Sequence, residues 1–183
     1  MHIEDREICN WMRERFEVLQ YETETPEKKQ HMYERLNWAH AWGEFMASKF
    51  NTTKRFGLEG CDSFVPGLKY LLDTAVENGA REFVIGMAHR GRLNTLANVV
   101  RKPMEVIMAE LQGVVPTFDG DEKQGAGDVK YHLGTTLERK YGKDQVDIRL
   151  TLMANPSHLE AVNPCVGGRA RAEQHFIGGD DEA

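Results

Sequence analysis

The sequence predicts an α/β domain with a mainly parallel sheet, preceded by a helical segment. Apolar residues recur at helical spacing in the first 54 residues, whereas residues 55–183 alternate between helical patterns and two strand-like runs. Strands that are separated by helices can pair side by side and parallel in one sheet. We therefore divide the chain into a helical N-terminal segment, 1–54, and an α/β domain, 55–183.

The helical segment contains a clear helix start at Thr25-Pro26-Glu27. A hydroxyl at the N-cap, a proline at the first helical position and an acid in the first turn are each favoured there. The apolar residues that follow at spacings of three and four form one stripe, which we expect to pack on a core. They are Met32, Leu36, Ala39, Trp42 and Met46.

The α/β domain opens with a helix that Asp62 can cap. Asn78-Gly79 ends this helix, because glycine readily takes the left-handed conformation that closes a helix. The apolar run 82–87 comes next and is typical of a strand that is covered on both faces. The expected apolar face of the helix comprises Phe64, Val65, Leu68, Leu71, Leu72, Ala75 and Val76.

Four further elements complete the expected order. We predict helices over 92–100 and from Pro103 to residue 111, then a Gly- and Asp-rich loop over about 113–130. A second strand over 146–154 ends at Asn155-Pro156. The order of helix, strand, helix, loop and strand supports the α/β prediction.

The composition argues against binding to nucleic acid or insertion into a membrane. Apolar residues make up 40% and charged residues 28% of the 183 residues, and the net charge is −6. No apolar run approaches the roughly 20 residues of a membrane-spanning helix. Cys9, Cys61 and Cys165 are widely spaced and form no CxxC pair, which favours a reducing compartment. The first residues resemble no targeting peptide, so we expect any such segment outside this chain.

Three polar clusters lie where an α/β sheet binds its ligands. His89-Arg90-Gly91-Arg92 directly follows the first predicted strand, and Asn155-Pro156-Ser157-His158 follows the second. The third cluster, residues 125–132, ends in His132 and lies in the loop between the strands. Because open α/β sheets bind ligands beyond the carboxyl ends of their strands, we interpret these clusters as functional.

The side chains of the clusters suit a small anionic substrate beside a phosphorylated cofactor. Arg90 and Arg92 supply fixed charge and forked donors for carboxylate or phosphate. The three histidines titrate near neutrality, so they can transfer protons or hydrogen-bond to a developing oxyanion. Ser157 can donate to a phosphate, and Gly125 and Gly127 let the backbone approach a ligand closely.

Other chemistries fit these clusters less well. His89, His132 and His158 are 43 and 26 residues apart, which matches no compact metal-ligand motif, so a metallohydrolase is disfavoured. A nucleophilic Ser157 would lack the G-x-S-x-G turn. Arg90 and Arg92 could instead be surface charges at a helix start. The helix dipole disfavours cations there, and a bound anion would offset that cost.

Four stretches carry a family resemblance. They are RFGLEG at 55–60, FVIGMAHRGRLN at 83–94, GDVKYHLG at 127–134 and ANPSHLEA at 154–161. In this order they resemble the signature blocks of the 2-oxoglutarate dehydrogenase family of thiamine-diphosphate-dependent decarboxylating components. A close relative that acts on 2-oxoadipate shares much of this pattern, so the length of the substrate stays open.

The resemblance implies a thiamine-diphosphate-binding α/β domain and a role in the tricarboxylic acid cycle. The implied reaction is the oxidative decarboxylation of 2-oxoglutarate, a 2-oxo dicarboxylic acid, with transfer of the succinyl group to a lipoyl arm. The implied cofactors are thiamine diphosphate and magnesium. The implied partners are a lipoyl-bearing succinyltransferase component and a second copy in a homodimer, in the mitochondrial matrix of eukaryotes or the cytoplasm of bacteria.

The same resemblance assigns roles to single residues. His89 and His132 would be catalytic, contacting the substrate and assisting proton transfer. Arg90 and Ser157 would contact both substrate and cofactor, and Leu159 would line the cofactor. His158 lies in the matching block, and we give it only a minor role. Several donors in one pocket suit a dicarboxylate, because each carboxylate needs a partner once water is excluded.

One part of the family pattern is not found in the sequence. The family holds the diphosphate through magnesium with a Gly-Asp motif and a downstream asparagine. Gly178-Gly179-Asp180-Asp181 is not that motif, because no apolar strand precedes it. We therefore expect the metal ligands to lie outside this chain, 55–183 to be a partial domain, and the chain alone to be inactive. A short non-catalytic product or an interaction module is the alternative.

Overall fold

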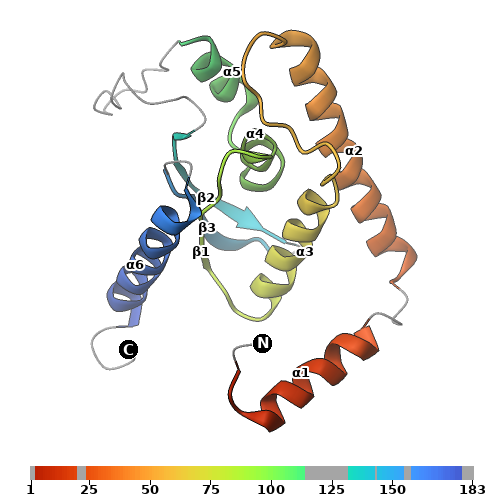
Figure 1. Cartoon of the computed structure of the whole chain (residues 1–183), viewed down its shortest axis with the longest axis vertical. Helices are drawn as coiled ribbons and strands as arrows, with labels where there is room; N and C mark the ends of the chain where they lie inside the picture. The colour runs from red at the N-terminus through yellow and green to blue at the C-terminus, as the bar shows by residue number, and fades with distance from the viewer. Residues whose placement is uncertain (1–2, 20–23, 114–131, 143, 155–157, 179–183) are drawn as a thin grey trace. The chain divides into compact units, whose positions relative to one another are not determined.

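The computed structural model describes residues 3–19, 24–113, 132–142, 144–154 and 158–178 (Figure 1). The chain forms two compact units, Met1–Glu34 and Arg35–Ala183. Among the described helices, none is both long and apolar enough to cross a membrane.

The first unit contains helix α1 (Arg6–Leu19) and the first turns of α2 (Pro26–Lys49). Asp5 caps α1, because its Oδ1 accepts hydrogen bonds from the amides of Glu7 at 2.8 Å and Ile8 at 3.0 Å. At the start of α2, the amide of Lys28 donates to Thr25 Oγ1 at 3.3 Å. The predicted helix start at Thr25-Pro26-Glu27 is therefore confirmed.

The remainder of α2 belongs to the second unit and packs on its core. Ala39, Trp42 and Met46 are buried, as predicted for the apolar stripe. Leu36 is 37% exposed, so the buried stripe begins one turn later than the sequence predicts.

Helix α3 (Phe64–Glu77) forms where it was predicted, but the face that it buries differs from the predicted apolar face. Its buried residues are Val65, Pro66, Lys69, Leu72 and Val76. These lie at helical spacings of three and four, and Lys69 is on the same stripe as its apolar neighbours. Leu71 is 58% exposed, so its place on the apolar face was predicted wrongly. Gly79, with a φ of 97°, follows the C-cap Asn78 and confirms the predicted helix end.

The sheet has the strand order β1-β3-β2, and it is mixed rather than mainly parallel. Strands β1 (Glu82–Ile85) and β3 (Val146–Leu152) were predicted and pair parallel. Strand β2 (Thr135–Tyr141) was not predicted and pairs antiparallel with β3, from Thr135 opposite Leu152 to Tyr141 opposite Val146. Only four residues join β2 to β3, a connection that is too short for a parallel crossover.

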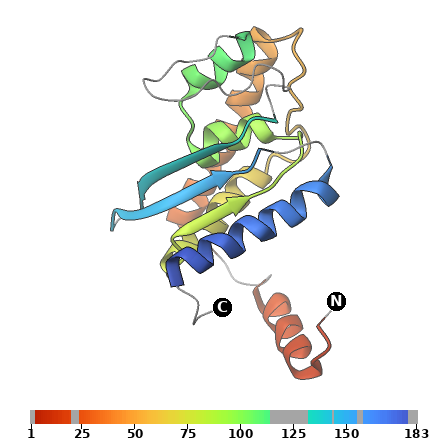
Figure 2. The same ribbon diagram turned by 90° about the vertical axis from the view of Figure 1, so that its left-hand side faces the viewer.

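The other helices cover the sheet from both sides. The predicted helix at 92–100 is a short α4 (Arg92–Asn94) followed by a π-helix, η1 (Thr95–Val100), which is buried throughout. Helix α5 (Met104–Gln112) follows it closely. Ile148, Leu150 and Leu152 of β3 join α2, α3 and η1 in one core. Helix α6 (Leu159–Gly178), which was not predicted, runs alongside β1 (Figure 2).

Candidate functional site

Three chain segments meet at one end of the sheet. They are the residues after β1, the residues before β2 and the residues after β3. The strand register brings them together, because Leu152 pairs with Ile85 on one side and with Thr135 on the other. The amide of Met153 then donates to the carbonyl of Ile85 at 2.9 Å. His89 of the first polar cluster and His132 of the third thus lie near each other.

Arg92 ties these three segments together from inside. Its side chain is fully buried, and its Nη1 donates to the carbonyl of Met87 at 3.1 Å. Its Nη2 donates to the carbonyls of Leu133 at 3.0 Å and Met153 at 2.6 Å, and more weakly to that of His132 at 3.5 Å. Hydrogen bonds to a charged donor each contribute about 1.5–3 kcal/mol.

This position corrects one interpretation of the sequence. Arg92 was expected, with Arg90, to offer charge to an anionic ligand. Its guanidinium instead binds main-chain carbonyls, and burial lowers its pKa to about 10. Arg92 is therefore a structural residue of the site.

Close backbone contacts also fix the geometry here. Gly134 lies against the next strand end, where a Cβ would come within 2.5 Å of the Ala154 nitrogen and 2.8 Å of the Leu152 oxygen. Gly91 has a φ of 77°, and a Cβ there would meet the side chain of Leu58. Both positions therefore require glycine.

Two histidines and one phenylalanine form a stack at this end of the sheet. The rings of His89 and His132 are stacked with centroids 4.9 Å apart, and Phe56 stacks on His89 at 4.8 Å. Desolvation lowers the pKa of His89, and the nearby His132, Arg92 and His158 lower it further. His89 is therefore neutral near pH 7, with one ring nitrogen as donor and one as acceptor.

Phe56 was missed as a site residue. It has a φ of 44°, which is rare for a bulky residue, and its carbonyl accepts a hydrogen bond from Gly91 at 2.8 Å. Arg90 Nη1 donates to the neighbouring Gly57 carbonyl at 3.2 Å. The stretch 55–60 therefore holds the loop that carries His89. No local pattern indicates this contact, because the two stretches are about thirty residues apart in the sequence.

The other described residues that were predicted for the site are exposed to solvent. Arg90 is exposed, and Leu159, at the start of α6, is 52% exposed. His158 is also exposed, with Nδ1 3.6 Å from Glu160 Oε1. Ser157 and residues 125–131 of the third cluster lie outside the described residues. In the part of the chain that the structure describes, no group of His, Cys, Asp or Glu is arranged to hold a metal ion.

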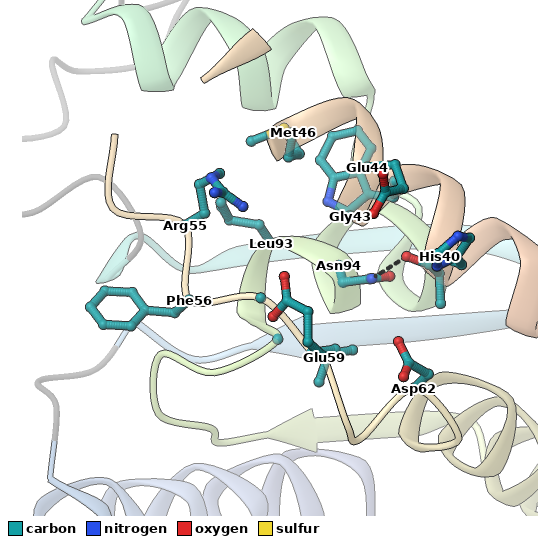
Figure 3. Close-up of a pocket in the computed structure, with 15 residues that line it drawn as sticks. His40, Gly43, Glu44, Met46, Arg55, Phe56, Glu59, Asp62, Leu93 and Asn94 are labelled. Carbon is teal, nitrogen blue, oxygen red and sulfur yellow. Dashed lines mark hydrogen bonds between the residues drawn. The ribbon is translucent and has the colours of Figure 1, made fainter. Parts of the chain in front are cut away.

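A pocket shares Phe56 with the histidine stack (Figure 3). It is lined by α2, the 55–62 region and α4, and Phe56 and Gly91 border it. Three carboxylates line it, Glu44, Glu59 and Asp62, so it would repel an anionic substrate. The Asn94 amide in its wall donates to the carbonyl of Ala39 at 2.8 Å. We therefore place the candidate site at the histidines and not in this pocket.

Comparison with known proteins identifies relatives along nearly the whole chain. Over 177 residues, 96% of this chain, it is 51% identical to the mitochondrial 2-oxoglutarate dehydrogenase of Dictyostelium discoideum. The proteins of the same name from Saccharomyces cerevisiae and Caenorhabditis elegans are 47% and 42% identical over 95% and 97% of the chain. The chain spans 17% of the length of each of these relatives. No protein-family model matches it. The resemblance drawn from the four sequence stretches is therefore confirmed, and the chain belongs to the 2-oxoglutarate dehydrogenase family as the counterpart of one segment of those proteins.

Proposed function

We propose that the protein carrying this chain catalyses the oxidative decarboxylation of 2-oxoglutarate and passes the succinyl group to a lipoyl-bearing succinyltransferase component. The names of the relatives support this reaction and a mitochondrial location. On this proposal, residues 55–183 form part of a thiamine-diphosphate-binding domain that works in a homodimer. Decarboxylation of 2-oxoadipate is the alternative that the shared sequence pattern leaves open.

The histidine stack is the observation that carries the proposal. His89 and His132 are far apart in the sequence, yet their rings are in contact beside an exposed arginine, Arg90. Imidazoles that titrate near neutrality can take up and release protons, and a guanidinium can bind a carboxylate through two parallel hydrogen bonds. This combination suits a small 2-oxo acid.

The described residues fit part of the cofactor. Arg90 offers a cation to an anionic group, and the exposed Leu159 offers an apolar surface to a ring. Ser157, proposed to contact cofactor and substrate, lies outside the described residues. The Gly-Asp motif of the family is not found in the sequence, so we propose that the metal ligands come from outside this chain.

The roles of the side chains follow from their surroundings. When bound, thiamine diphosphate would supply the nucleophilic carbon that attacks the keto group and would accept the electrons released with carbon dioxide. His89, neutral at pH 7, would accept or donate a proton at a ring nitrogen near the reacting carbonyl. His132 would also contact the substrate and assist proton transfer, and Arg90 would bind a carboxylate. Phe56 would limit the access of water to His89.

The test is to separate catalysis from cofactor binding in the protein that carries this sequence. We expect His89→Ala and His132→Ala each to reduce decarboxylation by about 100-fold or more, because each removes a proton-transfer group. The affinity for thiamine diphosphate with magnesium, measured by calorimetry, should change by less than about threefold, since neither residue is proposed to bind the cofactor.

A matched control is available on the last turn of α6. His175→Ala removes an exposed histidine and should leave both quantities unchanged. Equal losses of turnover and cofactor affinity in the His89 and His132 variants would contradict the assigned roles. Rates with 2-oxoglutarate and 2-oxoadipate, measured side by side, decide between the two substrates.

A further inference from the structure

A second group of cations gathers away from the histidine stack. Arg35 of α2, Lys69 of α3, Arg101 after η1 and Arg139 of β2 surround Tyr141, at the end of the sheet where β2 finishes. We call these four residues the cationic cluster. They come from four different elements, so only the folded second unit brings them together.

The contacts in the cationic cluster are close. Lys69 Nζ donates to Tyr141 Oη at 2.6 Å and lies 4.3 Å from the centre of the tyrosine ring. The guanidinium carbon of Arg139 lies 4.9 Å from the same ring centre. Arg35 Nη2 is 2.6 Å from Asp73 Oδ2. Lys69 and Arg139 therefore share one small volume at Tyr141, and Arg35 and Arg101 are near enough to repel the Lys69 ammonium.

The charges in this volume do not balance. Among the described residues, Asp73 is the only acidic group that interacts with Lys69 and Arg139. Burial raises the pKa of Tyr141, so the phenol stays protonated and contributes no negative charge. Four cationic side chains thus face a single carboxylate.

Burial makes the surplus charge costly. Lys69 is 6% exposed, and burial, with repulsion from Arg139, lowers its pKa to about 7. Arg139 donates one long hydrogen bond, from Nη2 to the carbonyl of Val99 at 3.3 Å. Its Nε is buried and has no hydrogen-bond partner among the described residues. A cation that is removed from water without a counter-charge is destabilising, and the described residues supply the cluster with one carboxylate, that of Asp73.

The cationic cluster is open to solvent on the side of Arg101. This side chain is exposed and stacks on Trp38, with its guanidinium carbon 4.6 Å from the ring centre. Its backbone has a φ of 70° at the end of η1, an unfavourable conformation for a residue other than glycine. Arg35 and Asp73 are also partly accessible. An external anion can therefore reach the cluster.

We propose that the cationic cluster is a binding site for a compact multivalent oxyanion of the phosphate type. A phosphate group at neutral pH carries nearly two negative charges and three acceptor oxygens, which matches the surplus of cations. Arginine forks bind such oxygens through paired hydrogen bonds, and the Lys69 ammonium, which has three N–H groups and uses one on Tyr141, adds further donors. Free phosphate and the phosphoryl group of a nucleotide share this chemistry. The inference is independent of the reaction proposed above.

Calorimetric titration at constant ionic strength tests the site in the protein that carries this sequence. We expect inorganic phosphate to bind with a Kd of about 1 mM or tighter. Arg101→Gln should weaken binding about tenfold or more, since one charged donor is lost. Adenosine monophosphate in place of phosphate shows whether a nucleotide carrying this group binds more tightly. The absence of binding by both probes would overturn the proposal.

Two further variants locate the anion. Arg101→Glu supplies a carboxylate to the cluster, so it should abolish phosphate binding and raise the melting temperature measured without phosphate. Arg90→Gln, which removes an arginine at the histidine stack, should leave phosphate affinity unchanged. If Arg90→Gln abolishes binding while Arg101→Gln has no effect, the phosphate binds at the histidine stack and the proposal is wrong. A lower melting temperature in Arg101→Glu, with phosphate binding retained, would also overturn it.

Discussion

Arg92, at the end of the sheet where β3 finishes, donates to four main-chain carbonyls, whereas Lys69, near the end where β3 begins, has one phenol as its hydrogen-bond acceptor. Both side chains are buried. Burial lowers the pKa of each, but Arg92 keeps its charge at neutral pH, while the pKa of Lys69 falls to about 7. A buried cation can therefore stabilise the fold through hydrogen bonds to the main chain, as Arg92 does, or remain a charge that is not neutralised, as at Lys69.

The difference shows how to interpret basic residues in this fold. At the histidine stack, main-chain carbonyls accept hydrogen bonds from both terminal nitrogens of the buried Arg92, so the exposed Arg90 is the arginine there that a ligand can reach. At the cationic cluster, the main chain supplies one carbonyl to Arg139 and the charges remain. The number of acceptors, and not the depth of burial, separates the two cases.

The largest expected effect comes from removing the hydrogen bonds of Arg92 near the histidine stack. Arg92→Met removes the donor for four carbonyls in a site that is closed to water. We expect the free energy of unfolding to fall by about 3 kcal/mol or more. Urea denaturation followed by circular dichroism measures this change. The matched control is Arg90→Met, two residues earlier in the chain, which should change the free energy of unfolding by about 0.5 kcal/mol or less. Similar losses of unfolding free energy in the two variants would show that the hydrogen bonds of Arg92 do not stabilise this end of the sheet.

The sequence predicted the elements whose local pattern agrees with their environment. The apolar run at β1, the cap at Thr25 and the glycine after α3 each depend on neighbouring residues, and the structure confirms them. β2 was missed because Arg139 and Tyr141 point inward between exposed charged residues, so the alternation of its side chains is not apolar and polar. Because β2 was missed, the sheet was wrongly predicted to be mainly parallel.

The candidate site was predictable only as far as residue type and strand position allow. His89 and His132 did come together, because β3 pairs with both β1 and β2 and so brings the residues after β1 and before β2 to one end of the sheet. Nothing in the sequence distinguished Arg92 from Arg90, since the difference lies in carbonyls contributed by residues 40 to 60 positions away. Lys69 was missed for a related reason. A lysine on an apolar stripe is normally expected to extend to water, and the depth of the stripe is set by the packing of α3 on η1 and the sheet.

A smaller effect is expected from removing the unneutralised charge. Lys69→Met keeps the length of the side chain and deletes its cation, so we expect the unfolding free energy at pH 7 in phosphate-free buffer to rise by about 1–2 kcal/mol. Arg92→Met and Lys69→Met would then have opposite signs, although both delete a buried cation. A loss of stability in Lys69→Met would show that its bond to Tyr141 outweighs the charge.

The same variant has a distinct dependence on pH. Between pH 7 and 10.5 the unfolded lysine holds a proton that the folded lysine has lost, so the stability of the wild type rises with pH over this range. The contribution is at most about 1.4 kcal/mol per pH unit. In Lys69→Met this contribution is absent. The difference between the urea midpoints of the two proteins should therefore shift in favour of the wild type from pH 7 to 10, and parallel curves would contradict the lowered pKa of Lys69.

The smallest effect concerns the electrostatics of the histidine stack itself. Repulsion by His132 is one cause of the lowered pKa of His89, second to desolvation. His132→Gln retains a polar side chain without a titrating charge, so we expect the pKa of His89 to rise but to stay below its ordinary value, because desolvation remains. NMR titration of the His89 ring protons measures it, with His175→Gln as the control that leaves it unchanged. Because burial is the larger cause, a pKa that returned fully to 6.5 would mean that the charge of His132, and not the enclosure by Phe56 and the strand ends, keeps His89 neutral.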